Sequence, residues 1–134
     1  GQLSKQLSLA ASAAIQKAEI RRATSAAPAG RQLPNVPDFQ ASFWADYQLT
    51  DKLGLNAGVY HQSKSFATIS NAVIVPAYTR FDAGARLQVS KTIRTQVAIE
   101  NIFNRHYIGT THTDNNLTPG SPRTLKFSFI LGGK

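Results

Sequence analysis

The stretch VIVPAYTRFDAGARLQV at residues 73–89 alternates apolar and polar side chains over an unusual length. Its odd positions are apolar except for Thr79, and its polar side chains stand at even positions, namely Tyr78, Arg80, Asp82, Arg86 and Gln88. Successive side chains of a β-strand point to opposite faces, so this strand has one apolar and one charged face. Strands of soluble sandwiches usually have about 5–6 residues, whereas about 9–11 residues or more suit a strand of a membrane-spanning β-barrel.

Five further stretches alternate in the same way. They predict strands at residues 7–20, 38–49, 53–62, 92–102 and 123–131. The first of them is rich in alanine, the best helix former, so a helix at residues 7–20 remains an alternative. We therefore expect about six long strands.

The connectors between these stretches alternate in length. Tight turns are expected at residues 50–52 and 90–91, and long segments at residues 21–37, 63–72 and 103–122. Tight turns at one rim and long loops at the other are typical of outer-membrane barrels. The pattern predicts an all-β fold, an antiparallel meander of three hairpins that forms part of a transmembrane outer-membrane β-barrel.

Composition limits the other classes. The chain has 134 residues, enough for one domain, and 42% apolar residues. No run approaches the ~20 apolar residues of a transmembrane helix. The absence of cysteine excludes a disulfide framework and a thiolate metal site. The chain begins with Gly1 and shows no signal-peptide pattern, so for an exported protein we expect a mature form or a fragment.

The net charge of +8 raises the question of a partner. Nucleic-acid binding requires basic residues on one face, ideally with aromatic stacking platforms. Here the fifteen Lys and Arg are dispersed, and only Arg21 and Arg22 are adjacent. We therefore predict no nucleic-acid partner. A basic lumen and basic loops that attract anionic ligands or anionic surface lipids fit better, and plain solubility is the alternative for most of these charges.

Candidate catalytic and metal-binding residues are weak. His61, His106 and His112 lack ligand spacing, and only His112 with Asp114 is locally suggestive, where a solvated loop is the preferred interpretation. No Ser-His-Asp set can be assigned from one sequence, and no phosphate-binding glycine loop occurs. We predict no catalytic residue, no metal ligand and no cofactor.

Four short passages occur in order along the chain. They are LPNVP at residues 33–37, VPAYTRFD at residues 75–82, ENIFNRHY at residues 100–107 and PGSPRT at residues 119–124. The first leads into a stretch that contains Trp44 and Tyr47. With these passages the chain resembles the C-terminal end of the TonB-dependent siderophore receptors of the Gram-negative outer membrane.

The resemblance implies a barrel of about 22 strands with a plugged lumen. Residues 1–134 would be a C-terminal fragment that lacks the plug domain and the remaining strands, because barrels of this kind need at least about eight strands. The implied partners are a ferric siderophore, the protein's own plug and other strands, TonB through the plug, and outer-membrane lipid. Iron would enter only as the chelate. One departure is that Phe129 is followed by ILGGK, whereas the family usually ends on an aromatic strand residue.

A candidate ligand site follows from the strand directions. Running outward along residues 53–62 and back along residues 73–89, the polar face near the outer rim carries Tyr60, Gln62, Tyr78 and Arg80, with Tyr107 in the adjoining loop. Aromatic rings and an arginine suit an anionic chelate, since arginine pairs with carboxylate-type oxygens. The alternative is that Arg80 pairs with Asp82 or a plug carboxylate while the tyrosines pack the wall.

Other side chains carry structural expectations. Gly54, Gly58 and Gly84 would leave room on the polar face for a neighbouring backbone or the plug, and Trp44 would pack against whatever fills the lumen. Aromatic girdle positions are predicted at Tyr47, Phe127 and Phe129.

Two other classes remain open. One is another outer-membrane barrel, such as a porin, an adhesin, a lipid-modifying enzyme, or a haem or cobalamin receptor. The other is a soluble β-sandwich binding module, which would have short strands.

Overall fold

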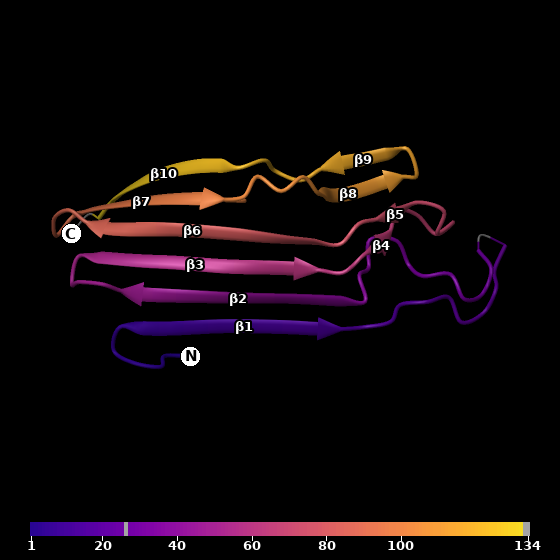
Figure 1. The fold of residues 1–134 in the computed structure, drawn as a ribbon, viewed down its shortest axis with the longest axis horizontal. Helices are drawn as coiled ribbons and strands as arrows, with labels where there is room; N and C mark the ends of the chain where they lie inside the picture. The colour runs from indigo at the N-terminus through magenta and orange to yellow at the C-terminus, as the bar shows by residue number, and fades with distance from the viewer. Residues whose placement is uncertain (26, 133–134) are drawn as a thin grey trace.

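The computed structural model describes residues 1–25 and 27–132 and contains one long antiparallel sheet (Figure 1). Its strand order is β1-β2-β3-β6-β7-β10, which is the predicted meander of six strands. The bounds are β1 Leu7–Ile15, β2 Phe39–Gln48, β3 Leu53–Gln62, β6 Tyr78–Gln88, β7 Ile93–Glu100 and β10 Thr124–Leu131. We refer to these six strands as the wall.

Residues 7–15 form a strand, so the helical alternative is wrong there. β1 ends at Ile15 rather than at residue 20 as predicted. Ile15 pairs with Phe39, the first residue of β2, and Pro37, two positions before Phe39, has no N–H to continue the ladder. Beyond this point irregular contacts link the two segments, among them the Gln16 N–H bond to Asp38 O, the Leu33 N–H bond to Ala18 O and a bridge between Glu19 and Gln32.

The prediction of one strand over residues 73–89 is wrong at its start. Residues Ile74–Val75 form the short strand β5, which pairs with β4, Ser65–Phe66. Pro76 separates β5 from β6, because proline cannot donate to a ladder. The connector at residues 103–122 also contains structure, a hairpin of β8 (Ile108–Thr113) and β9 (Asn116–Pro119).

The register keeps each face of the wall uniform. Phe43 pairs with Val59 and Val59 pairs with Phe81, whereas Ser42 pairs with Tyr60 and Tyr60 pairs with Arg80. A slip of one residue would exchange the two faces, so the alternation fixes the pairing. Both tight turns form where expected, closed by the Leu49 N–H bond to Leu53 O and by the Val89 N–H bond to Ile93 O.

No second layer covers either face of the wall in Figure 1. Among the described residues of the wall only Gly54 and Asp82 are buried. Apolar side chains remain open to the outside, with Phe127 66% and Phe129 75% exposed. That these two rings form an interface girdle stays a prediction.

Within residues 1–25 and 27–132, no helix is long and apolar enough to cross a membrane.

Candidate ligand-binding site

The five residues predicted for ligand contact lie together at the end of the wall where β3 ends and β6 begins. Tyr60 pairs with Arg80 and Gln62 pairs with Tyr78 in the ladder between these strands. The ring centroids of Tyr60 and Tyr78 are 5.8 Å apart. Tyr107, which is 27 positions after Arg80, stacks on Tyr78 with centroids 4.2 Å apart and an interplanar angle of 24°. Three aromatic rings therefore stand in a row beside one arginine.

Arg80 is held from two sides. Its Nε and Nη2 donate to Asp82 Oδ2 at 3.2 and 2.9 Å, and its Nη1 donates to the Tyr107 hydroxyl at 3.3 Å. The sequence analysis gave this ion pair with Asp82 as the alternative to ligand contact by Arg80. A guanidinium has five N–H donors, so part of the fork remains available beyond these bonds. The pairing orients Arg80 and is compatible with a further anionic partner.

The Tyr60 hydroxyl is oriented by two glutamines. It lies 3.1 Å from Gln40 Oε1 and 3.0 Å from Gln62 Oε1, and its single proton can be donated to either. Gln62 therefore acts in this arrangement as an acceptor for Tyr60.

Asn101 is a part of the site that sequence reasoning missed, and Asp82, expected only as a partner of Arg80, has a second role in binding Asn101. Asp82 Oδ1 accepts the backbone N–H of Asn101 at 2.8 Å, and Asn101 is 1% exposed. The Asn101 side chain accepts from Arg105 N at 2.8 Å and donates to Arg105 O and Ser121 O, both at 2.9 Å. Asn101 thus binds both ends of the loop that carries Tyr107 through its side chain, and it binds the strand that carries Arg80 through its backbone N–H.

The ENIFN passage at residues 100–104 contained a sequence signal for these contacts of Asn101. Asn101 and Asn104 have positive φ angles of 53° and 50°, and asparagine tolerates this left-handed region better than most residues. Asn104 Oδ1 accepts the backbone N–H of Arg123 at 2.9 Å, which is a second link between the two ends of the loop. Two asparagines three positions apart therefore indicated a closed turn.

Gly120 makes room for Tyr107. Its N–H donates to Tyr107 O at 2.8 Å, and a Cβ at position 120 would overlap the Tyr107 ring. A pocket of about 500 Å³ adjoins this point, with Pro76, Arg105, His106 and Tyr107 among its lining residues. Tyr107 therefore borders open space.

A second charged cluster lies along the wall, away from the first. Arg86 forms two bonds to the carboxylate of Asp46, one of them from Nη2 at 2.6 Å, and a third to Gln48 at 3.0 Å. Its guanidinium lies over Gly54, where a Cβ would meet it. Arg86 has no aromatic neighbour among the described ring pairs, so it lacks the surroundings of Arg80.

The expectation for the three wall glycines needs correction. Space at Gly58 is taken by the Trp44 ring and space at Gly54 by Arg86, both from neighbouring strands. At Gly84 the neighbours are the Asn56 side chain and the Val97 backbone, so only this position fits the expectation of a close backbone. Trp44 packs on the wall itself, which was not foreseen.

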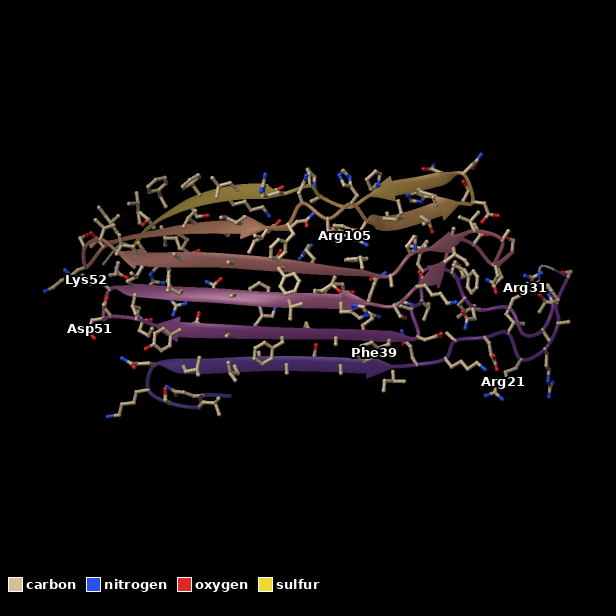
Figure 2. The ribbon with its side chains drawn as sticks, in the orientation of Figure 1. Arg21, Arg31, Phe39, Asp51, Lys52 and Arg105 are labelled. Carbon is tan, nitrogen blue, oxygen red and sulfur yellow. The ribbon has the colours of Figure 1, made fainter. Side chains whose placement is uncertain are left out.

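Labelled side chains in Figure 2 show charged groups on both sides of the wall, with Asp51 and Lys52 at the end with the tight turns and Arg31 among the long connections beyond the other end. Within the described residues no group of three or more His, Asp or Glu could hold a metal ion. Asp114, which the sequence placed near His112, instead accepts hydrogen bonds from Thr68 at 2.7 Å and Ser70 at 2.9 Å.

Comparison with known proteins identifies the class of this wall. The family described as TonB dependent receptor-like, β-barrel, matches residues 2–102. The chain belongs to this family. Its fold is therefore a segment of a receptor β-barrel.

Two relatives are receptors by name. A probable TonB-dependent siderophore receptor, PiuA, of Acinetobacter baumannii is 32% identical over 95 residues, which cover 71% of this chain and 13% of the relative. The catecholate siderophore receptor Fiu of Escherichia coli K12 is 29% identical over 116 residues, which cover 82% of this chain and 15% of that receptor.

Solved structures agree on the fold. The ferric preacinetobactin receptor BauA of A. baumannii superimposes with a TM-score of 0.84 at 26% identity, over 98% of this chain and 20% of BauA. The closed form of Fiu gives a TM-score of 0.85 at 23% identity, over 98% of this chain and 19% of Fiu. The chain therefore spans about a fifth or less of the proteins it resembles.

Proposed function

We propose that this chain supplies the last six strands and three long loops of an outer-membrane receptor that imports a ferric siderophore with energy from TonB. The names of PiuA, Fiu and BauA support the cargo class, and the family match supports the barrel. The rest of the barrel and a plug domain would come from the same protein, and TonB would act through the plug. The role is transport and binding, with iron as cargo inside its chelate.

The observation that carries the proposal is the row of Tyr60, Tyr78 and Tyr107 beside Arg80. A ferric siderophore with carboxylate or catecholate oxygens presents negative charge and flat apolar parts. Arginine pairs with the oxygens through its planar fork, and the tyrosine rings offer aromatic surface and hydroxyl donors. In a barrel the same side chains face the lumen, because they occupy the polar face of the wall.

The orientation of the segment follows from the same assignment. The tight turns would face the periplasm and the three long connections the cell exterior, as is general for such barrels. The tyrosine row would then stand at the outer end of the lumen, where a chelate arrives. Outer-membrane lipid would cover the apolar face.

The test is a matched pair of substitutions in the full-length receptor. Arg80→Ala should weaken ferric-siderophore binding about tenfold or more, because a charge-assisted hydrogen bond contributes about 1.5–3 kcal/mol. Arg86→Ala removes an ion-paired arginine from the same strand and face but away from the rings, and it should change Kd less than about twofold. Fluorescence-quench titration gives Kd, and heat-dependent gel mobility confirms that each barrel is folded.

Two outcomes would contradict different parts of the proposal. If both variants bind chelate like the parent, the site assignment is wrong and the receptor assignment stands. If cells that express the folded parent receptor take up no radiolabelled iron from any carboxylate or catecholate siderophore, the transport function itself is contradicted.

A further inference from the structure

Three long connections of the chain meet at one point, which we call the loop junction and define as Asn35, Ala67 and Thr111. The Thr111 hydroxyl lies 2.8 Å from Ala67 O and 2.9 Å from Asn35 Oδ1. Asn35 Nδ2 donates to Thr111 O at 3.3 Å, and Asn35 N donates to Phe66 O at 2.9 Å. Asn35 and Thr111 are 76 positions apart in the sequence. Each long connection of the wall contributes one member.

Two members of the loop junction, Ala67 and Thr111, are buried, whereas Asn35 is exposed. Ala67 is 2% and Thr111 is 6% exposed. Asn35 has a φ angle of 57°, so its backbone is in the left-handed region that asparagine tolerates. A buried hydroxyl that loses its acceptors, or a buried acceptor that loses its donor, costs more than the bond itself contributes. The loop junction is therefore a specific fastening point between loops.

A second fastening lies at the tip of the same hairpin. Asp114, between β8 and β9, accepts from Thr68 Oγ1 at 2.7 Å and Ser70 Oγ at 2.9 Å. The β8–β9 hairpin is thus hydrogen-bonded to the connection between β3 and β6 at two positions, Thr111 and Asp114. In Figure 1 the hairpin extends beyond the ends of β6 and β7, on the side of β4 and β5.

The base of this hairpin carries the ligand site. Tyr107 immediately precedes β8, and Gly120 immediately follows β9 and bonds to it. Thr111 lies on β8, four positions after Tyr107. Its hydrogen bonds therefore limit where the Tyr107 ring can lie. Holding a binding group in its bound position lowers the ordering cost of association.

We propose that Asn35 and Thr111 are positioning residues for the ligand site, and that they keep Tyr107 stacked on Tyr78 and bonded to Arg80. The inference rests on the proposed function. It also gives a role to the LPNVP passage, whose asparagine is Asn35. Neither residue belongs to the wall, so their loss should free the hairpin without opening the barrel.

The test uses Thr111→Val in the full-length receptor, which removes the hydroxyl and keeps the shape. We expect Kd for the ferric siderophore to rise about tenfold, the effect of about one buried hydrogen bond. Barrel unfolding in urea should be unchanged. Thr111→Ser, which retains the hydroxyl, should bind like the parent. The control is Thr110→Val, an exposed neighbour on β8 with no side-chain hydrogen bond among the described contacts, and its Kd should match the parent.

A double-mutant cycle tests whether Thr111 acts through Tyr107. In a Tyr107→Ala background, Thr111→Val should cause no further loss of binding, because the ring it positions is absent. An equal tenfold loss in both backgrounds would overturn the proposal, and so would parent-like binding by Thr111→Val where Tyr107→Ala binds weakly.

A readout independent of ligand separates this proposal from the proposed function. A spin label at Thr118→Cys, on the exposed β9 strand, should become more mobile in Thr111→Val and regain parent mobility in Thr111→Ser. Unchanged mobility in Thr111→Val overturns the anchoring role, whatever the ligand is. If mobility rises while Arg80→Ala and Tyr107→Ala bind chelate like the parent, the site assignment fails, and with it the positioning role, while the loop junction as a fastening remains.

Discussion

The wall and the three long connections differ in how many of their residues are buried. Among the described residues the wall buries only Gly54 and Asp82. The connections bury seven residues, namely Ala27, Pro37, Ser65, Ala67, Val75, Asn101 and Thr111. The wall therefore buries almost none of its own side chains, and in the proposed receptor lipid would cover one face and the rest of the protein the other. The connections depend on their own polar contacts, which join loops far apart in the sequence.

The largest effect is expected from a charge on the outer face of the wall. Val97 is an apolar-face residue of β7, and it pairs with Ala85 and Phe127. Val97→Arg in the full-length receptor should lower the free energy of unfolding by about 2–4 kcal/mol, because an arginine near the bilayer midplane loses its hydration. Urea unfolding in lipid vesicles, followed by tryptophan fluorescence, measures this change.

The adjacent position supplies the control. Gln96 precedes Val97, so its side chain points to the opposite face, where it pairs with Arg86 and Ser128. Arg86 is already neutralised by Asp46, so Gln96→Arg should cost clearly less than Val97→Arg. Equal losses of stability in the two variants would show that the two faces of the wall are wrongly assigned.

A smaller effect is expected where the wall does have internal packing. A side chain at Gly58 would collide with the Trp44 ring. Gly58→Val should therefore lower the free energy of unfolding by about 1–3 kcal/mol, the usual cost of overpacking. In a Trp44→Ala background the same change should cost little, because the space is then free. Urea unfolding of the four variants gives the coupling, and a cost that persists without Trp44 would exclude this contact as the cause.

The wall could be predicted from the sequence because the alternation of apolar and polar residues shows directly which side chains share a face of a strand. Residues 53–62 were predicted with correct bounds, and the register later placed Val59 opposite Phe43 and Phe81 as the pattern requires. The end of β1 was missed because it depends on the partner strand, which begins only at Phe39. A strand's length is thus a property of the pair.

The members of the candidate site were correctly predicted to lie together, whereas the contacts that support them were missed. That they bind a ligand stays a prediction. Tyr60, Tyr78 and Arg80 follow from strand direction and period, and Tyr107 stacks where the loop was expected to bring it. The contacts of Asn101 with Asp82 and Ser121 span 19 and 20 positions, and no local period reports loop closure over such a distance. The asparagines with positive φ angles were the available signal. They indicate turns, but they do not indicate which residues bond across the loop.

The most direct test of the account is which rim of the wall faces the outside of the cell. Lys91 lies in the tight turn between β6 and β7, and Asn115 lies at the tip of the β8–β9 hairpin. Single changes to cysteine in a full-length receptor without other cysteines can be probed on intact cells with a membrane-impermeant thiol reagent. The account predicts that Asn115→Cys is labelled and that Lys91→Cys is labelled only after the outer membrane is permeabilised. Labelling of Lys91→Cys on intact cells, with Asn115→Cys protected, would contradict it.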